Sequence, residues 1–225
     1  MRKSSTLPTL AAILIFAALT VQPGGAQGKF SWTVTFDGFP PIQPGSIIGI
    51  AHYFEQDVWF QAIGPLPSGP PYYLDRAGGG VAHFPENGSA YLLTGLGGSL
   101  ALFNPWDRPF GVVSVDLAEF STLYAEPLTV GFVGYRADGS SFTQEFVTDG
   151  IIDGTGPLPD FQTFYFDSRF ANVVRVEVPS YGWALDNMVF SSVPEPSSFA
   201  LLAVGAAMGL VFRRRRGSVQ RFPPV

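Results

Sequence analysis

The sequence predicts an all-β protein, an antiparallel β-sandwich or jelly roll of roughly ten strands. Three observations support this fold class. Apolar and polar residues alternate in short runs along most of the chain, turn-forming clusters of Gly and Pro separate the runs, and no internal stretch of ten or more residues carries a clear helical stripe. Many short strands between Gly- and Pro-rich turns favour an antiparallel sandwich over a parallel α/β sheet.

The predicted strands follow one another from Phe30 to Phe190. In the first, Phe30, Trp32, Val34 and Phe36 alternate with polar residues, which indicates a strand with one buried face. The other β-like runs are Ile47–Phe54, Val58–Ile63, Ala90–Leu93, Leu100–Phe103, Gly111–Leu117, Leu128–Tyr135, Ser141–Thr148, Phe161–Phe166, Val173–Val178 and Ala184–Phe190. Turn clusters between them include Asp75–Gly80 and Arg136–Gly139, and the second predicts a hairpin. Asp116–Tyr124 is expected to form at most a short helical turn.

The N-terminus has the organisation of a secretory signal peptide. Arg2 and Lys3 precede an apolar core, Leu10–Val21, and small residues end at Ala26. This order predicts residues 1–26 as a signal peptide cleaved after Ala26. The alternative, a retained N-terminal anchor, is disfavoured because the apolar core is short.

The C-terminus has three consecutive elements. A Val193-Pro194-Glu195-Pro196-Ser197 motif precedes a hydrophobic helix predicted over residues 198–212, and Arg213, Arg214, Arg215 and Arg216 follow it. Arginines resist crossing a bilayer, so the apolar run is expected to enter the membrane and stall there. The run Phe199–Phe212 would cover about 21 Å as a helix, whereas a bilayer core is roughly 30 Å thick, so it is marginal as a permanent anchor.

These C-terminal residues resemble the PEP-CTERM sorting signal of exported bacterial proteins. The resemblance implies processing by an exosortase, a membrane-embedded protease, and surface or matrix delivery in a Gram-negative bacterium that makes extracellular polysaccharide. An ordinary C-terminal anchor would share the helix and the arginines, but it gives no reason for Pro194-Glu195-Pro196. The expected organisation is a signal peptide (1–26), a β-sandwich domain (27–192), a sorting signal (193–216) and a short tail (217–225) that departs from such signals.

The predicted mature domain is strongly acidic. Seventeen acidic and six basic residues lie between Gln27 and Ser192, a formal charge of −11. Such a domain is a poor nucleic-acid binder, because that affinity comes from cationic contacts. The chain has no Cys and two His, which excludes thiol catalysis and cysteine-based zinc sites.

The domain also resembles jelly rolls found among carbohydrate-binding modules. The resemblance rests on the motifs Gly111–Ala118, Val130–Gly139 and Ala184–Phe190. In such modules an aspartate of the last strand often binds a structural calcium ion, which implies Asp186 as a ligand and Asp37 as its partner. The alternative is that Asp37 forms a turn and Asp186 ends a strand.

Three aromatic residues in predicted turns are candidate sugar contacts: Trp106, Tyr181 and Trp183. A flat ring beside a charged group can stack on a sugar while the polar group binds its hydroxyls. The alternative is that these rings cover the ends of a sandwich.

The expected function is that of a non-enzymatic, exported surface or matrix protein that associates with extracellular polysaccharide. No nucleophile elbow, zinc-protease or phosphate-loop motif is present. The rival hypothesis is a secreted polysaccharide hydrolase that uses an unrecognised carboxylate pair. A third is a structural surface protein without a small ligand.

Overall fold

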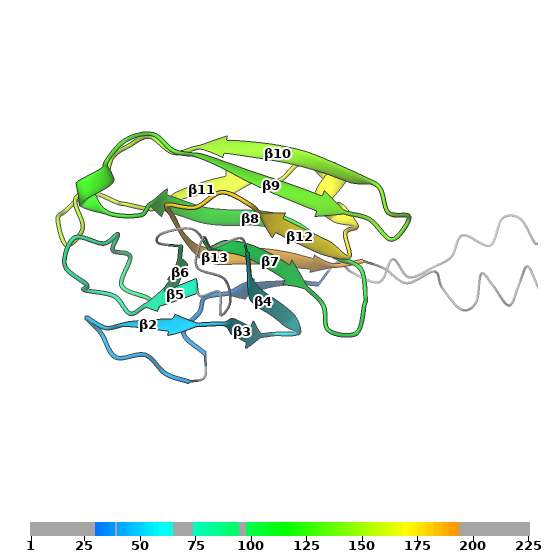
Figure 1. The fold of residues 1–225 in the computed structure, drawn as a ribbon, viewed down its shortest axis with the longest axis horizontal. Coiled ribbons are helices and arrows are strands. Elements are labelled where there is room, and N and C mark those ends of the chain that lie inside the picture. The colour runs from blue at the N-terminus through cyan, green and yellow to red at the C-terminus, as the bar shows by residue number, and fades with distance from the viewer. Residues whose placement is uncertain (1–29, 39, 65–73, 95–97, 194–225) are drawn as a thin grey trace, which may run out of the picture. The chain divides into compact units, whose positions relative to one another are not determined.

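The computed structural model describes residues 30–38, 40–64, 74–94 and 98–193 (Figure 1). The predicted signal peptide, the hydrophobic helix over residues 198–212 and the arginine cluster lie outside these ranges. Within the ranges, no helix is long and apolar enough to span a membrane.

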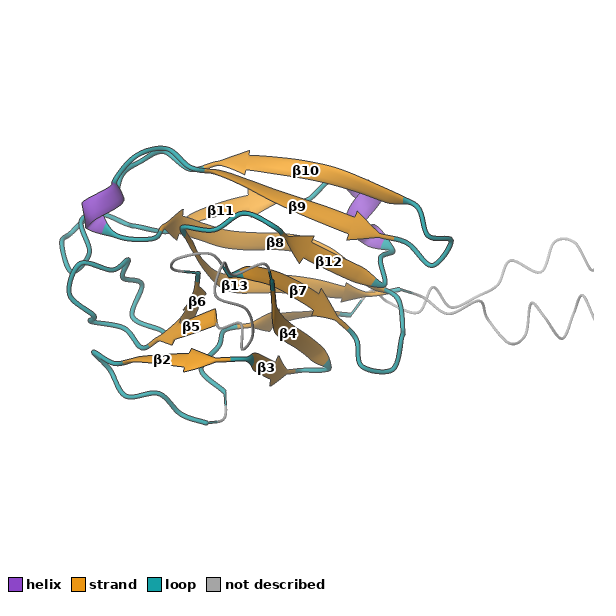
Figure 2. Ribbon diagram, viewed as in Figure 1, coloured by secondary structure: helices purple, strands orange, loops and turns teal. Residues whose placement is uncertain are grey.

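Two antiparallel sheets pack face to face, as the alternating pattern predicted (Figures 1 and 2). The seven-stranded sheet has the order β11 (Gln162–Tyr165), β8 (Phe110–Glu119), β13 (Trp183–Ser192), β6 (Tyr91–Leu93), β5 (Leu74–Ala77) and β2 (Ile47–Ile50), and β1 (Ser31–Val34) also pairs with β13. The six-stranded sheet has the order β10 (Ser141–Val147), β9 (Thr129–Tyr135), β12 (Arg175–Val178), β7 (Ser99–Phe103), β4 (Val58–Ile63) and β3 (His52–Glu55). Two short 3₁₀ helices, η1 (Thr122–Tyr124) and η2 (Ser168–Ala171), lie in connections.

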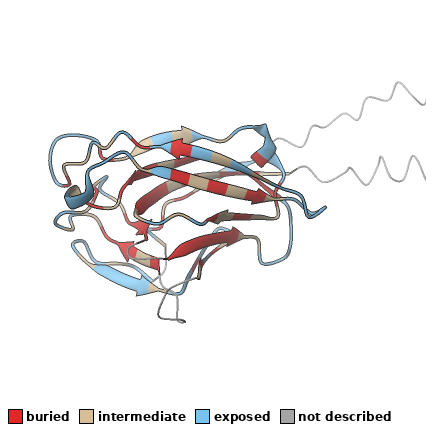
Figure 3. Cartoon of the chain, turned by 45° about the horizontal axis from the view of Figure 1, so that its top comes forward, coloured by how far each residue is buried: buried red, intermediate tan, exposed pale blue. Residues whose placement is uncertain are grey.

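The core fills the space between the sheets. Along β9, alternate residues point inward and are buried, whereas their neighbours are partly exposed. β8 and β13, by contrast, are buried at most positions on both faces (Figure 3). Burying aromatic side chains stabilises such a core strongly, at about 25 cal/mol per Å² of apolar surface removed from water. Phe36, Phe60 and Phe190 are examples: all three are fully buried, and the Phe60 ring packs against both of the others.

Most predicted strands are present, with small differences at their ends. The run Val58–Ile63 matches β4 at both ends, and the predicted hairpin turn joins β9 to β10. There, Gly139 N donates to Arg136 O and Gly139 has a φ of 83°, a conformation that glycine adopts without strain. The run predicted over Ile47–Phe54 is two strands, because the chain passes from one sheet to the other between β2 and β3.

The prediction of a turn over Asp75–Gly80 is wrong for its first residues, which belong to β5. β5 places the fully buried Arg76 between the sheets. Arg76 Nε donates to Phe36 O (2.6 Å), Nη2 donates to Gly38 O (2.9 Å), and Nη1 donates to Pro40 O. The guanidinium also lies 5.0 Å from the centroid of the Tyr53 ring. One buried cation thus organises the loop that follows β1.

Candidate functional site

The outward face of the six-stranded sheet carries a row of aromatic and charged side chains. Strand register places Phe54 opposite Trp59, Trp59 opposite Phe103, Phe103 opposite Arg175, and Arg175 opposite Tyr135. Cross-strand neighbours on one face lie within side-chain contact distance. We call this set, with the adjacent His52 and Glu177, the outer strip. It crosses five strands, a width of roughly 19 Å at ~4.8 Å per strand.

One half of the outer strip is aromatic. The ring centroids of His52 and Trp59 are 4.9 Å apart, and those of Phe54 and Trp59 are 5.7 Å apart. Phe54 is 43% exposed, and Trp59 keeps part of its surface in contact with solvent. Solvent-facing positions of a strand are usually polar, so three adjacent rings here indicate a surface suited to a flat, apolar ligand face.

The other half is a fixed polar group. Arg175 Nε donates to Glu177 Oε1 (2.7 Å), and Tyr135 OH donates to Glu177 Oε2 (2.9 Å). The hydrogen bond to Glu177 raises the pKa of Tyr135, which keeps the phenol protonated. The Arg175 guanidinium lies 6.0 Å from the Phe103 ring centroid. Oriented donors and acceptors beside exposed rings can bind the hydroxyl groups and the flat face of a sugar.

Sequence reasoning missed the outer strip. An aromatic residue at an alternating strand position is by default expected in the core, and that expectation is correct for Tyr53 and Phe60. A signal was available, because β3 and β4 carry aromatic residues at both odd and even positions. Successive residues of a strand point to opposite faces, so only the odd or only the even aromatic residues of a strand can point inward.

The three predicted sugar contacts lie apart. Trp106 (58% exposed) lies in the loop before β8, at the end of the sandwich where β13 finishes. Tyr181 (62% exposed) lies before β13, at the opposite end. Trp183 is fully buried, and its Nε1 donates to Ser180 O (2.8 Å). The three rings therefore do not form one surface, and Trp183 is a core residue.

Asp37 and Asp186 both bind the segment Asn87–Ala90. Asp37 Oδ1 accepts a hydrogen bond from Ala90 N (2.9 Å). Asp186 is fully buried, and its Oδ2 accepts from Ser89 Oγ (2.8 Å) and from Asn87 Nδ2. Both predicted ligands thus fix the same covering segment to the seven-stranded sheet.

The oxygens of Asp186 are largely occupied by hydrogen-bond donors, since Oδ1 also accepts from Asn187 N (2.7 Å). Calcium takes ~6–8 oxygen ligands, so an ion at Asp186 would have to displace some of these donors. Within the described ranges, no group of three or more acidic or histidine side chains is arranged to hold a metal. A calcium site at Asp37 and Asp186 stays a prediction: a higher melting temperature in calcium than in chelator would support it, and equal values would contradict it.

Asp116 lies directly opposite Asp186 on the neighbouring strand. Asp116 Oδ2 accepts from Asn187 Nδ2 (2.9 Å), and Oδ1 accepts from Thr163 Oγ1 (2.6 Å). Burial, aided by the charge of Asp116, raises the pKa of Asp186 to about 7. The chain thus does have a pair of opposed carboxylates with one perturbed pKa, but both accept hydrogen bonds from the protein, and the segment Asn87–Ala90 covers Asp186.

Comparisons with known proteins give a sorting motif and distant structural likenesses. No curated protein matches the chain in sequence. A mutant of a family 29 carbohydrate-binding module is 11% identical with a TM-score of 0.33, covering 73% of this chain and 86% of that one. The family 11 carbohydrate-binding module of the cellulosomal cellulase Lic26A-Cel5E of Clostridium thermocellum is 9% identical with a TM-score of 0.26, covering 74% and 98%. Likenesses this weak carry no argument about function.

The sorting motif begins where the sheet ends. Ser192 is the last residue of β13, and its N–H donates to Phe30 O (2.8 Å). Residues 192–216 match the PEP-CTERM protein-sorting motif. The chain therefore carries a PEP-CTERM sorting signal, which directs it through export and membrane sorting toward the cell surface.

Proposed function

We propose that this protein is a non-enzymatic surface protein that binds extracellular polysaccharide on its outer strip. The single observation that carries the proposal is the continuous row of rings and polar groups from Phe54 to Tyr135, on a sheet face where solvent-facing residues are usually polar. The PEP-CTERM signal supports the location, because it delivers the domain to the surface where such polymers lie. Exosortase processing in a Gram-negative envelope belongs to the same proposal.

The charge of the domain favours a neutral ligand. Acidic residues outnumber basic residues by eleven between Gln27 and Ser192, so a strongly anionic polymer would be repelled. The ligand we expect is a neutral glycan lying across the strands, with ring faces on Trp59 and Phe103 and hydroxyls on Arg175 and Glu177.

Substitution of Trp59 by Ala should weaken glycan retention about tenfold, because the strip loses its central ring. The measurement is retention of the purified protein on a panel of neutral and anionic polysaccharides. Tyr124→Ala is the matched control, since it removes an exposed ring (69%) outside the strip. Equal retention of Trp59→Ala and the parent protein would contradict the strip, and no retention of either on any glycan would contradict polysaccharide binding itself.

The rival function, a polysaccharide hydrolase, would use Asp116 and Asp186. Their separation across adjacent strands resembles that of a retaining glycosidase pair, roughly 5 Å. Against it, Asn87 and Ser89 already donate to Asp186, and Asn187 and Thr163 already donate to Asp116. Turnover of a polysaccharide that Asp186→Asn abolishes would establish the rival and overturn the non-enzymatic proposal.

A further inference from the structure

The segment that covers Asp186 contains an Asn-Gly pair. The chain has four asparagines, and of these Asn87 alone is followed by glycine. The main-chain nitrogen after an asparagine can attack the side-chain amide, because Cβ, Cα and the carbonyl carbon already join the two and the attack closes a five-membered ring. Glycine has no side chain to shield that nitrogen. Asn87 and Gly88 are both exposed, and among the described residues beyond its chain neighbours nothing lies within 4 Å of the place that a Cβ would take at Gly88.

A carboxylate lies at the attacking nitrogen. Gly88 N donates to Glu86 Oε1 (2.5 Å), and Glu86 Oε2 accepts from Gly80 N. The second hydrogen bond fixes the carboxylate, so Oε1 stays at the proton that Gly88 N must lose. A general base within hydrogen-bond distance of the proton it removes accelerates such a step by ~10²–10⁴. Glu86 thus occupies the position of the base.

The amide under attack is held at both of its polar atoms. Asn87 Oδ1 accepts from Ser89 N (3.1 Å), and it shares the proton of Ser89 Oγ (2.8 Å) with Asp186. Asn87 Nδ2 donates to Asp186 Oδ2. Donors on the carbonyl oxygen stabilise the negative charge that develops there when a nucleophile adds to Cγ. A nucleophile, its base and the donors for an oxyanion therefore lie together within residues 86–89, which are the parts of an acyl-transfer site.

We propose that Asn87 deamidates in the folded protein, in a reaction that its own neighbours promote. Gly88 N loses its proton to Glu86 and forms a bond to Asn87 Cγ. The bond from Cγ to Nδ2 breaks, and the nitrogen leaves as ammonia after the proton that Glu86 removed returns to it through solvent. The product is a cyclic imide. Water then adds to one of the two imide carbonyls and opens the ring, which leaves aspartate or isoaspartate at position 87.

The reaction changes what holds the covering segment in place. An aspartate at position 87 has an oxygen where Asn87 has the donor Nδ2, so the fully buried Asp186 loses a donor and faces a second carboxylate. Isoaspartate also lengthens the main chain by one atom. Both products loosen the segment Asn87–Ala90 from the seven-stranded sheet. The outer strip lies on the six-stranded sheet, so this reaction and glycan binding are independent.

The test compares the folded full-length protein in detergent with the same protein unfolded in urea, both at neutral pH. Mass spectrometry of digested samples measures the fraction of residue 87 that has lost its amide, and an isoaspartyl methyltransferase assay measures isoaspartate. We expect deamidation about tenfold faster in the folded protein, because the base and the oxyanion donors are positioned only there. An equal or slower rate in the folded protein would overturn the proposal, since the neighbours would then hold the amide away from attack.

Two variants test the base. Glu86→Gln should slow deamidation of the folded protein about tenfold and leave the rate in urea unchanged. Glu126→Gln neutralises an exposed carboxylate in the loop after η1 and should keep the parent's rate in both conditions. A Glu86→Gln variant that deamidates as fast as the folded parent would overturn the role of Glu86.

A residue exchange tests the loosening. Asn87→Asp should lower the melting temperature of the domain. Asn87→Asp combined with Asp186→Asn places an amide donor opposite a carboxylate again and should recover at least half of that loss. An Asn87→Asp variant that melts with the parent would show that the covering segment stays in place after deamidation, which would overturn the loosening.

Discussion

The protein should become more stable as the pH falls from 8 to 5, and Asp186→Asn should remove most of that gain. Burial raises the pKa of Asp186 to about 7, far above the ordinary value of 3.8 for a carboxyl group in an unfolded chain. The folded state therefore binds this proton more tightly than the unfolded state. Its contribution to stability is fully present below about pH 4 and is lost as the pH rises through 7. Each tenfold difference in proton affinity between the two states corresponds to ~1.4 kcal/mol, so the full effect is on the order of 4 kcal/mol.

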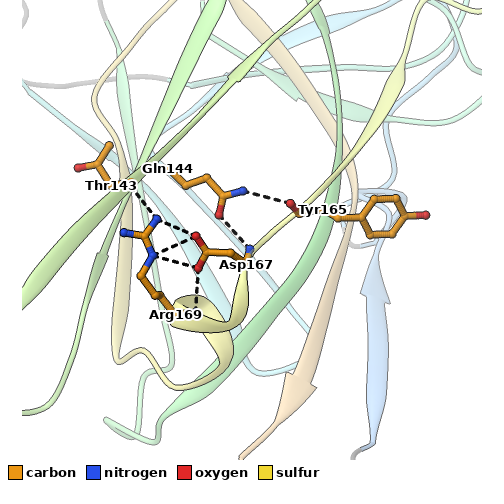
Figure 4. A network of polar contacts seen from close by, with 5 residues as sticks. All are labelled: Thr143, Gln144, Tyr165, Asp167 and Arg169. Atoms are coloured by element: carbon orange, nitrogen blue, oxygen red, sulfur yellow. Dashed lines mark hydrogen bonds and ion pairs between the residues drawn. The ribbon is translucent and has the colours of Figure 1, made fainter.

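Other aspartates also affect how the stability of the domain depends on pH. Burial also raises the pKa values of Asp75 and Asp160, which adds to the gain on acidification. Hydrogen bonds from Arg169 and Ser140 lower the pKa values of Asp167 (Figure 4) and Asp138. The contribution of these two exposed aspartates is small and is lost only below the ordinary carboxyl pKa of 3.8, outside the range from pH 8 to 5.

Urea unfolding at pH 5 and pH 8 measures the difference. Glu145→Gln, a neutralised exposed carboxylate on β10, is the control and should keep the parent's pH dependence. Asn at position 186 can still hold Asn87 and Ser89, whose amide and hydroxyl can reorient to suit it. Two results would contradict the prediction: a parent protein that loses stability between pH 8 and 5, or an Asp186→Asn variant with the same pH dependence as the parent. Either would show that ionisation of Asp186 does not lower the free energy of unfolding.

Alternation of side chains predicted the strands well, because it reports directly on which residues are buried in a two-sheet sandwich. It failed at β5. The strand runs from Leu74 to Ala77 and places the charged Arg76 at an inward position. Three glycines follow it, so the local sequence is typical of a turn. What makes the strand is the distant loop 36–40, whose carbonyls accept from Arg76.

The candidate site was less predictable than the fold, for a related reason. Whether Trp59 or Phe60 faces solvent depends on which face of the sheet packs against the second sheet. Alternation alone does not decide this, because both of these successive positions are aromatic. The partners of Asp186 are separated from it by 97 and 99 positions, so its saturation by Ser89 and Asn87 has no local signal. The sorting signal was predictable because its information is linear: motif, apolar run and arginines stand in order along the chain.

Replacement of Arg76 by Met should destabilise the domain by about 3 kcal/mol. Met preserves much of the side-chain volume, but it leaves the carbonyls of Phe36, Gly38 and Pro40 without their common donor. Each unsatisfied buried acceptor costs roughly 1–3 kcal/mol, partly offset because the loop can relax toward water. The conformation of Phe36 adds to the loss of stability. Its ring is fully buried and its backbone has a φ of 58°, and the hydrogen bond from Arg76 to its carbonyl helps to hold that conformation.

A buried ion pair can often be replaced by apolar residues without loss, because both charges are removed together. Arg76 differs, since its partners are main-chain carbonyls that no substitution at position 76 removes. Arg76→Lys should therefore lie between the parent and Arg76→Met: a single ammonium group carries the charge but cannot reach three carbonyls in the planar arrangement of a guanidinium. Arg108→Met, an exposed arginine replaced in the same way, should change the free energy of unfolding by less than about 0.5 kcal/mol. Urea unfolding of the four proteins gives the order, and an Arg76→Met variant as stable as Arg108→Met would mean that water satisfies the three carbonyls and that the loop after β1 holds its shape without the cation.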